Sequence, residues 1–284
     1  MRPDGLEFFG RVNLLKGGLE FSDALTTVSR KYAQEIQTPE LGFGLDGVLR
    51  ERAGVLTGIL NGVDYTEWDP RTDQFIAARY SPDRLEGKRE CKADLLDAFG
   101  LPRENLDRPL IGIVARFAGQ KGFDLVEQVA APLLEEDLAL VALGTGEPRY
   151  EQLFLDLAAA NSGRAGARIA YDNALAHKIE AGADMFLMPS LYEPSGLNQM
   201  YSLRYGTVPI VRATGGLDDT IDEETGFKFD EYSGAALLEA VRAALAAYRD
   251  PDKWTAMMLA GMRRDYSWQA SASAYSALYR RLTS

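Results

Sequence analysis

From about residue 108 onward, short apolar runs alternate with longer stretches in which apolar residues recur every three or four positions. The short runs predict buried β-strands, and they read LIGIVAR, LALVALG, ARIAYD, DMFLMPS and VPIVRA. The stretches between them, such as QKGFDLVEQVAAPLLEE and RYEQLFLDLAAANSG, have the spacing of amphipathic helices. Continuous apolar strands separated by helices indicate a parallel sheet covered on both faces. The pattern therefore predicts an α/β, doubly wound, Rossmann-like domain.

The two ends of the chain follow different patterns. Near the start, GLEFSDALTTVSRKYAQEIQ predicts a helix, a short strand and a second helix, a unit too small to form a sheet by itself. The next segment, TPELGFGLDGVLRERAGVLTGILNGVDYTEWDP, is predicted to be a loop-like link. The C-terminal part predicts two or three helices with a break at Asp250-Pro251, because proline fits a first helical turn. We therefore expect three parts, residues 1–50, 51–249 and 250–284.

The amino-acid composition limits the kinds of molecule that the chain is expected to bind. A chain of 284 residues, 46% of them hydrophobic, can build a sizeable core. The net charge of -11 argues against a general binder of nucleic acid or of membrane surfaces, since such partners favour broad basic faces. The single cysteine, Cys91, excludes an intrachain disulfide and suits a reducing cytoplasm. No apolar run approaches the ~18–20 residues of a membrane span, and no signal peptide is evident, so we expect a soluble cytoplasmic protein.

Candidate ligand-binding residues lie just beyond the carboxyl ends of the predicted strands, where open α/β sheets bind ligands. The residues at these ends are Arg116, Lys121, Gly144, Thr145, Gly146, Tyr171, Glu193, Thr214, Gly215 and Gly216. Arg116 and Lys121 can hold a diphosphate, and the glycines let backbone N–H groups approach phosphate oxygens. Tyr171 can stack on a base, and Glu193 can accept hydrogen bonds from sugar hydroxyls. Together these groups indicate a nucleotide-sugar.

Most of these features also have a purely structural interpretation. Arg116 and Lys121 can be solvated residues at a strand end and a helix start. The segments 144–146 and 214–216 can be tight turns, and the first lacks the third glycine of a dinucleotide fingerprint. Glu193 is harder to explain in this way, because a buried carboxylate without a partner costs several kcal/mol.

Two further features suggest catalytic or metal-binding roles but are more typical of structure. His177 lies on a predicted helix beside apolar residues, as a structural histidine does, and as the chain's single histidine it excludes a polyhistidine metal site. An acidic run can hold a divalent cation, although a solvated helix start or turn is the more usual role of such a run. Its members are Asp218, Asp219, Asp222, Glu223 and Glu224.

Several motifs resemble the bacterial glycogen synthase and plant starch synthase family. They read ARFAGQKGFDL, ALGTGEPRYEQ, AHKIEAGADMFLMPSLYEPSGLNQMYSLRYGTVPIVRATGGLDDTI and GILNGVDYTEWDP, and the similarity extends over essentially the whole chain. Related sugar-nucleotide transferases carry a second glutamate eight residues after the first. Here Tyr201 occupies that position, which is the pattern of the synthases that use ADP-glucose. The resemblance implies a GT-B fold and a hexosyltransferase that moves glucose from ADP-glucose to the non-reducing end of an α-1,4-glucan, with retention of configuration.

The same resemblance assigns roles to individual residues. Arg116 and Lys121 match the pair that neutralises the donor diphosphate, and Glu193 matches the essential glutamate beside the donor glucose. The donor-binding residues that it implies are Gly144, Thr145, Gly146, Tyr171, Ser195, Gly196, Leu197, Thr214, Gly215 and Gly216. Tyr171 matches a position near the adenine, and Ser195 stands where many relatives have cysteine. No second carboxylate is nearby in sequence to complete a glycosidase pair, so we expect the leaving phosphate itself to help deprotonate the acceptor. The resemblance implies neither a metal nor a cofactor: the donor substrate is ADP-glucose and the product is ADP.

The resemblance further predicts that the chain begins inside the last part of the family's first Rossmann-like domain. The triplet Lys16-Gly17-Gly18 is similar to the family's donor-contacting loop, but its flanks match a different segment near the domain junction. We therefore expect the chain to need a missing N-terminal half for glucan synthesis, and its last helices to pack at the domain junction. Two alternatives are a transferase of this architecture that uses UDP-glucose or another donor, and a nucleotide- or glucan-binding module without transferase activity.

Overall fold

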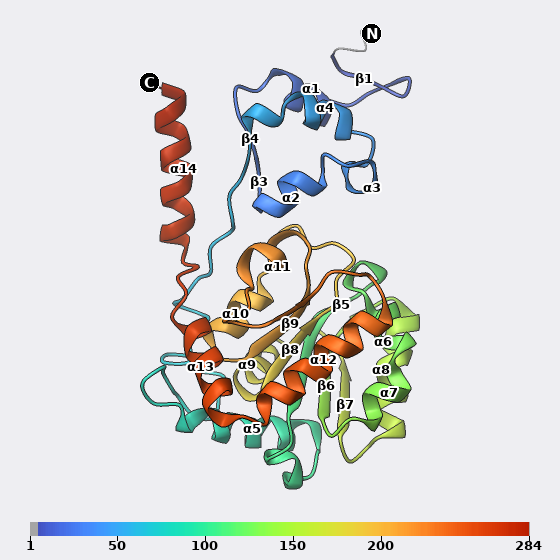
Figure 1. Cartoon of the computed structure of the whole chain (residues 1–284), viewed down its shortest axis with the longest axis vertical. Helices are drawn as coiled ribbons and strands as arrows, with labels where there is room; N and C mark the ends of the chain where they lie inside the picture. Colours follow the sequence, from blue (N-terminus) through green and yellow to red (C-terminus); the bar gives the residue numbers. More distant parts are fainter. Residues whose placement is uncertain (1–4, 284) are drawn as a thin grey trace. The chain divides into compact units, whose positions relative to one another are not determined.

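A computed structural model describes residues 5–283, which form two compact units (Figure 1). One unit joins the chain up to Gly62 with the segment from Tyr266 onward, and the larger unit is Val63–Asp265. These divisions differ from the boundaries expected after residues 50 and 249. The reason lies in the last two helices: α13 (Pro251–Met262) buries Trp254 and Met257 in the core of the larger unit, whereas α14 (Trp268–Thr283) belongs to the smaller one.

A six-stranded parallel sheet forms the centre of the larger unit. The strands are β5 (Leu110–Phe117), β6 (Ala139–Gly146), β7 (Ala165–Ile169), β8 (Met185–Met188), β9 (Val208–Arg212) and β10 (Phe227–Phe229). Their order in the sheet is β10-β9-β8-β5-β6-β7, and every pairing is parallel. The chain enters at β5, builds outward to β7 and then returns to the other side of β5 with β8. This reversal is the topological switch point of a doubly wound sheet, so the predicted Rossmann-like fold is confirmed.

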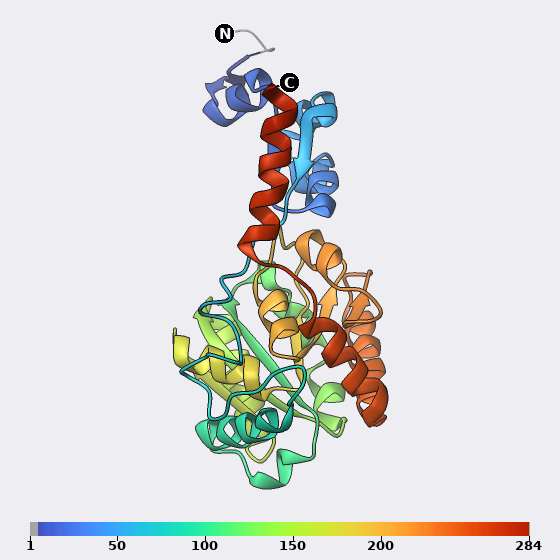
Figure 2. The same cartoon turned by 90° about the vertical axis from the view of Figure 1, so that its left-hand side faces the viewer.

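Helices cover both faces of the sheet (Figure 1, Figure 2). They are α5 (Glu86–Phe99), α6 (Phe123–Gln128), α7 (Ala130–Glu135), α8 (Pro148–Ala160), α9 (Asn173–Gly182), α10 (Asn198–Arg204), α11 (Gly215–Thr220) and α12 (Gly234–Tyr248). On one face, Phe123, Phe154 and Leu237 share a core with the inward side chains of the strands. On the other face α9 lies close to Gly112, where a Cβ would come within 2.6 Å of Ile179 Cγ2. Burial on both faces explains why the strands read as continuous apolar runs.

Three local predictions for the larger unit need correction. The single helix expected over QKGFDLVEQVAAPLLEE is two, α6 and α7, which meet at Val129, where φ is -110°. Pro132 follows in the next turn, where it lacks an N–H and clashes with a continuous helix. Strand β6 does not end before the Gly144–Gly146 turn but continues through it, because Gly146 pairs with Phe117 of β5. Helix α5 has no counterpart among the predicted elements.

The smaller unit consists of short elements and one long helix, α14. They are β1 (Glu7–Phe8), β2 (Arg11–Val12), α1 (Leu14–Phe21), β3 (Leu25–Thr27), α2 (Arg30–Glu35), α3 (Pro39–Gly42), α4 (Asp46–Glu51), a 3₁₀ turn η1 (Ala53–Val55), β4 (Leu56–Gly58) and α14. The predicted helix, strand and helix correspond to α1, β3 and α2. The loop-like prediction for residues 38–70 was wrong in part, since this segment contains α3, α4 and β4, and β4 pairs with β3 in parallel. Lys16 lies within α1 rather than in a loop.

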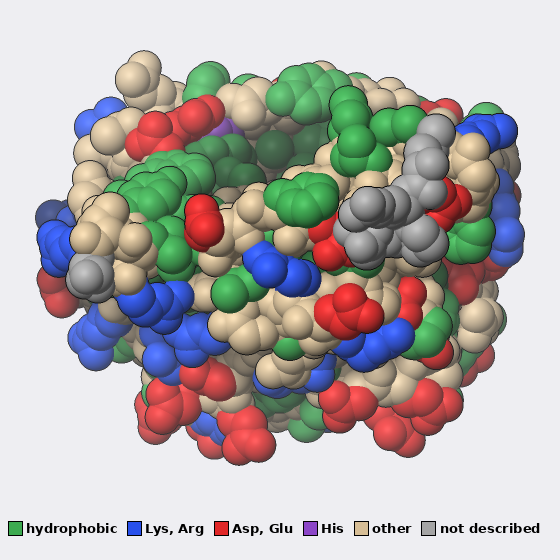
Figure 3. All heavy atoms as spheres, turned by 90° about the horizontal axis from the view of Figure 1, so that it is seen from above, with side chains coloured by type: hydrophobic (Ala, Val, Ile, Leu, Met, Phe, Trp, Pro, Cys, Tyr) green, Lys and Arg blue, Asp and Glu red, His purple; other side chains and the backbone are tan. Residues whose placement is uncertain are grey.

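Several large apolar side chains of the smaller unit are exposed. They are Leu14, Leu15, Phe9, Phe21 and Phe43. On the face of the chain that Figure 3 shows, hydrophobic side chains form separate groups with acidic and basic side chains between them. Exposed apolar surface of this kind favours association when it is contiguous and is tolerated when it is interrupted by charge.

The C-terminal part forms three helices, and the predicted break at Asp250-Pro251 is confirmed. The Asp250 side chain accepts a hydrogen bond from the Lys253 N–H, and Pro251 occupies the first helical position, where its missing N–H is not needed. Within residues 5–283, no helix combines the length and the apolar character needed to cross a bilayer.

A layer of buried polar groups joins α5, α9 and α10. Lys88 Nζ donates to the carbonyl oxygens of Ala181 and Tyr205 at 3.0 and 3.1 Å. Glu180 is 1% exposed and accepts a hydrogen bond from Ser202 Oγ at 2.6 Å. Burial raises the pKa of Glu180 to about 8 and lowers the pKa of Lys88 to about 8. The interior therefore favours the uncharged form of both side chains.

We predict that Glu180→Gln increases the free energy of unfolding relative to the parent, and that this gain grows between about pH 5 and about pH 8. Between the ordinary glutamate pKa of 4.5 and the folded value of about 8, the unfolded chain has lost a proton that the folded chain keeps. Stability therefore falls as pH rises through this range, and glutamine removes that loss while keeping an acceptor for Ser202. Urea unfolding of both proteins across the range measures the difference.

Glu239→Gln, at an exposed position of α12, is the matched control for the removal of one carboxylate. A Glu180→Gln gain that does not vary with pH would contradict the prediction.

Candidate functional site

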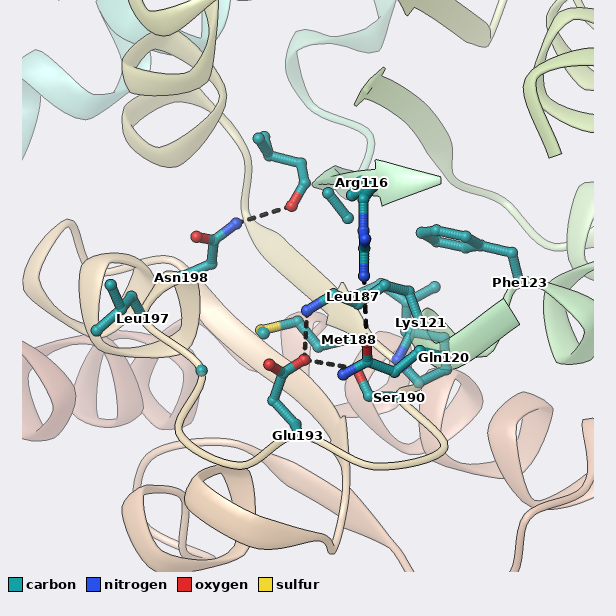
Figure 4. A pocket seen from close by; sticks show the side chains of 14 residues that line it. Arg116, Gln120, Lys121, Phe123, Leu187, Met188, Ser190, Glu193, Leu197 and Asn198 are labelled. Atoms are coloured by element: carbon teal, nitrogen blue, oxygen red, sulfur yellow. Dashed lines mark hydrogen bonds and ion pairs between the residues drawn. The ribbon is translucent and has the colours of Figure 1, made fainter. Parts of the chain in front are cut away.

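A pocket of about 350 Å³ lies at the carboxyl ends of β5 and β8, where the strand order reverses. Arg116 comes from the end of β5, Lys121 from the 3₁₀ turn η3 (Gly119–Lys121), and Glu193 from the loop after β8. All three line the pocket, and Figure 4 shows them converging on it from different segments. The structure therefore brings together the three residues that the sequence predicts to be catalytic.

The carboxylate of Glu193 is buried, and one of its oxygens accepts two hydrogen bonds. The residue is 6% exposed, and its Oε2 accepts hydrogen bonds from Lys121 Nζ at 2.6 Å and from Ser190 Oγ at 3.0 Å. The Lys121 side chain is itself only 22% exposed. The paired cation offsets the cost of holding a carboxylate away from water.

Arg116 differs from Lys121 in being exposed to solvent. Its Nη2 donates to Gln120 Oε1 at 3.4 Å, a long and therefore weak hydrogen bond. Asn198, at the start of α10, donates through Nδ2 to the Val114 carbonyl oxygen at 2.7 Å. This hydrogen bond connects the start of α10 to the backbone of β5 at the pocket (Figure 4).

A second pocket, of about 450 Å³, adjoins the first and shares Arg116 and Asn198 with it. Gly144 and Thr145 from β6 and Tyr171 from the loop after β7 line it, together with unpredicted residues. Tyr171 is 91% exposed, which leaves its ring accessible to a ligand. The two pockets together make a groove along the carboxyl edge of the sheet.

Trp68 and Tyr201 line the second pocket and belong to a stack of three rings. Trp68 lies between Tyr201, at a centroid distance of 4.0 Å, and His177, at 3.8 Å. His177 is fully buried, and its Nδ1 lies 2.7 Å from Asp73 Oδ2, in agreement with the structural interpretation. Burial raises the pKa of Tyr201 to about 12, so its hydroxyl remains protonated at neutral pH.

Sequence reasoning did not identify Trp68 or Glu180 as lining residues of the second pocket. Trp68 belongs to a segment expected to be a loop-like link. Because it lies far in sequence from the strands, the local pattern does not place it beside the pocket. A weak signal was available for Glu180, since it follows Ile179 and precedes Ala181 in an otherwise apolar end of α9.

Some of the predicted donor-binding residues do not line either pocket. They are Gly146, Ser195, Thr214, Gly215 and Gly216. Gly146 N–H and the Thr145 hydroxyl donate to Glu151 Oε1 at 2.8 and 2.7 Å, and these bonds lower the pKa of Glu151. The end of β6 is thus capped by a side chain from α8.

The glycines at the start of α11 support the loop that carries Glu193. A Cβ at Gly215 would lie 1.9 Å from the Glu193 carbonyl oxygen, and one at Gly216 would lie 1.7 Å from that of Ser195. Gly216 N–H also donates to the Glu193 carbonyl oxygen at 3.0 Å. Only glycine allows the two backbone segments to approach this closely.

Several carboxylates of the acidic run form ion pairs with basic side chains. Asp218 bonds Lys228 at 2.7 Å, and Arg264 bonds Asp222 at 2.6 Å and Glu224 at 3.2 Å. Across the described part of the chain, no group of three or more His, Cys, Asp or Glu side chains is arranged to hold a metal ion. Asp218 lies in the first turn of α11 and Asp222 begins the turn after it, in agreement with the interpretation of this run as a helix start or turn.

Two family models match the sequence. The model described as "Starch synthase catalytic domain" matches residues 1–51, and "Glycosyl transferases group 1" matches residues 99–257. Among curated proteins, the glycogen synthase of Koribacter versatilis is 58% identical over 281 residues, which are 96% of this chain and 58% of that protein. The glycogen synthase of an Anaeromyxobacter species is 55% identical, with 99% of this chain and 60% of that protein covered.

Solved structures give the same result. The catalytic domain of starch synthase IV from Arabidopsis thaliana, bound to ADP and acarbose, matches with a TM-score of 0.90 and 37% identity, covering 99% of this chain and 60% of that one. Sucrose-phosphate synthase from Thermosynechococcus elongatus, at 23% identity and a TM-score of 0.64, shares the fold. This chain spans 58% to 60% of the length of the two glycogen synthases and of the starch synthase IV catalytic domain. The predicted resemblance is confirmed, and the chain belongs to the group 1 glycosyltransferases, with the glycogen and starch synthases as relatives.

Proposed function

We propose that this chain carries the donor half of a glycogen synthase that transfers glucose from ADP-glucose to the non-reducing end of an α-1,4-glucan, with retention. The observation that carries the proposal is the meeting of Arg116, Lys121 and Glu193 in one pocket at the switch point of the sheet. The names of the glycogen synthase relatives and the ADP and acarbose held by starch synthase IV support it. The proposal is limited to the donor half because the chain spans 58% to 60% of those relatives and the residues that meet in the pocket are those matched to the donor.

The groove suits the parts of ADP-glucose in order. Arg116 and Lys121 offer cationic donors to the diphosphate, with Arg116 able to bind two oxygens at once. Tyr171, at the rim of the second pocket, offers a free ring face on which the adenine stacks. Glu193 accepts hydrogen bonds from hydroxyls of the glucosyl group.

In the transfer, the bond between glucose C1 and the ADP oxygen breaks, and C1 bonds to the O4 hydroxyl oxygen of the acceptor. The acceptor proton passes to an oxygen of the departing phosphate. Arg116 and Lys121 stabilise the charge that grows on ADP as it leaves. Glu193 positions the sugar rather than attacking it, because it is the sole carboxylate among the described residues of its pocket and Lys121 and Ser190 hold its Oε2.

We further propose that the reaction uses no cofactor or metal ion and takes place in the cytoplasm. Two cations already supply the charge that a metal would bring to a diphosphate. The one cysteine, Cys91, is buried and unpaired, which suits a reducing compartment.

We predict that Arg116→Ala and Lys121→Ala each weaken ADP binding about 10- to 100-fold, since each removes a charge-assisted hydrogen bond to phosphate. Isothermal titration calorimetry of the purified chain measures the dissociation constants. Arg103→Ala, which removes an exposed arginine paired with Asp97, is the control and leaves ADP affinity unchanged.

Unchanged ADP affinity in both variants would refute the assignment of the diphosphate site. Tighter binding of UDP than of ADP would instead favour a transferase that uses UDP-sugars.

We predict that Glu193→Gln weakens binding of ADP-glucose about 10-fold and leaves the affinity for ADP unchanged or slightly higher. The variant loses a charged acceptor for the sugar hydroxyls, while Lys121 no longer shares its charge with a carboxylate. Calorimetric titrations with the two ligands measure this difference. Equal losses for both ligands would show that Glu193 supports nucleotide binding through Lys121 and does not act on the sugar.

We predict that Tyr171→Ala weakens ADP binding about 10-fold, whereas Tyr171→Phe has little effect, because stacking needs the ring and not the hydroxyl. Fluorescence titration or calorimetry with ADP distinguishes the two variants. A loss in both variants would show that the hydroxyl, and not the ring face, contacts the nucleotide.

A further inference from the structure

Gln199, in the first turn of α10, is fully buried beside the turn that carries Glu193. Its Nε2 lies 3.1 Å from the carbonyl oxygens of Ser195 and Gly196, and 3.2 Å from Thr220 Oγ1 on α11. Three oxygens therefore surround the amide nitrogen. The reverse orientation of the amide would turn an oxygen toward these oxygens, so the nitrogen must be the donor.

Thr220 extends this contact to the other end of the turn. Its Oγ1 donates to the Gly216 carbonyl oxygen at 2.6 Å, and Gly216 N–H donates to the Glu193 carbonyl oxygen at 3.0 Å. A continuous set of hydrogen bonds thus runs from Gln199 through Thr220 and Gly216 to the backbone of Glu193. The turn of residues 193–196 is held from α10 on one side and from α11 on the other.

This arrangement leaves one polar atom unsatisfied. Gln199 Oε1 is buried and has no hydrogen-bond partner among the described residues. It faces Gly196, where φ is +63° and where a Cβ would lie 2.5 Å from the oxygen. Buried polar atoms without partners are uncommon, and native proteins retain such local conflicts chiefly where a functional group must be placed. The unsatisfied oxygen therefore makes this contact a candidate for a positioning role.

We propose that Gln199 is a positioning residue for the donor site. By holding the Ser195 and Gly196 carbonyl oxygens, it fixes the turn and keeps the Glu193 carboxylate against Lys121 in the pocket. Its effect on donor binding rests on the function proposed above, whereas its effect on the turn does not. An apolar side chain of equal length would fill the same space without supplying a donor.

The expected effect of Gln199→Met is local. We expect backbone amides of residues 190–198 to exchange with deuterium about 10-fold faster, since the turn loses its hydrogen bonds to α10. Exchange in strands β5 and β6 remains as in the parent. Affinity for ADP-glucose falls about 10-fold, and affinity for ADP falls less, because Arg116 and Lys121 hold the diphosphate independently of the turn.

Hydrogen–deuterium exchange with mass spectrometry on the full chain tests the proposal, with ADP and ADP-glucose titrations of the same samples. Thr220→Val, which removes the hydroxyl from the α11 side with little change of shape, is expected to act in the same direction. Gln152→Met, on the surface of α8, is the matched control and changes neither readout.

Unchanged exchange of residues 190–198 in both Gln199→Met and Thr220→Val overturns the proposal. An equal rise in exchange throughout the larger unit also overturns it, because Gln199 would then serve stability alone. If Gln199→Met does not fold, Thr220→Val decides by the same criterion. A parent chain that binds neither ADP nor ADP-glucose would refute the proposed function, while the exchange data would still decide the role of Gln199 in the turn.

Discussion

The ion pair between Lys121 and Glu193 is the interaction on which the site depends. It connects the segment after β5 with the segment after β8, which the sheet makes neighbours only because the chain reverses direction between them. A carboxylate that is 6% exposed requires such a partner, because burial without one is unfavourable. In the function proposed above, the cation that stabilises Glu193 in the folded chain also binds the donor diphosphate.

That ion pair depends in turn on how closely backbone segments approach one another. Gly122, just after Lys121, has a φ of +73°, and a Cβ there would lie 1.9 Å from the Pro189 carbonyl oxygen. Gly215 and Gly216 allow α11 to approach the turn of residues 193–196 in the same way. The glycines therefore act mainly by making room for backbone, and Gln199 adds the hydrogen bonds that hold the turn once it has been placed.

The second pocket shows how a segment without regular structure can contribute to a site on a rigid sheet. Trp68 is held between the rings of Tyr201 and His177, and Asp73 fixes His177 from the same segment. Stacked rings and a buried charge-assisted hydrogen bond hold this segment in place although it forms no helix or strand. Through Trp68, this segment lines the second pocket, where we propose that the adenine of ADP-glucose binds.

The sequence by itself determined the parallel sheet, the break at Asp250-Pro251 and the place of Arg116, Lys121 and Glu193 at strand ends. Each of these follows from local periodicity or from a residue type whose geometry is nearly independent of context. Only the tertiary structure decided that α6 and α7 are separate and that Gly215 and Gly216 lie behind the Glu193 turn instead of lining a pocket. It also decided that Trp68 and Glu180 line the second pocket and that Gln199 contacts the turn that follows Glu193. These outcomes depend on contacts between residues far apart in sequence, which no local pattern encodes.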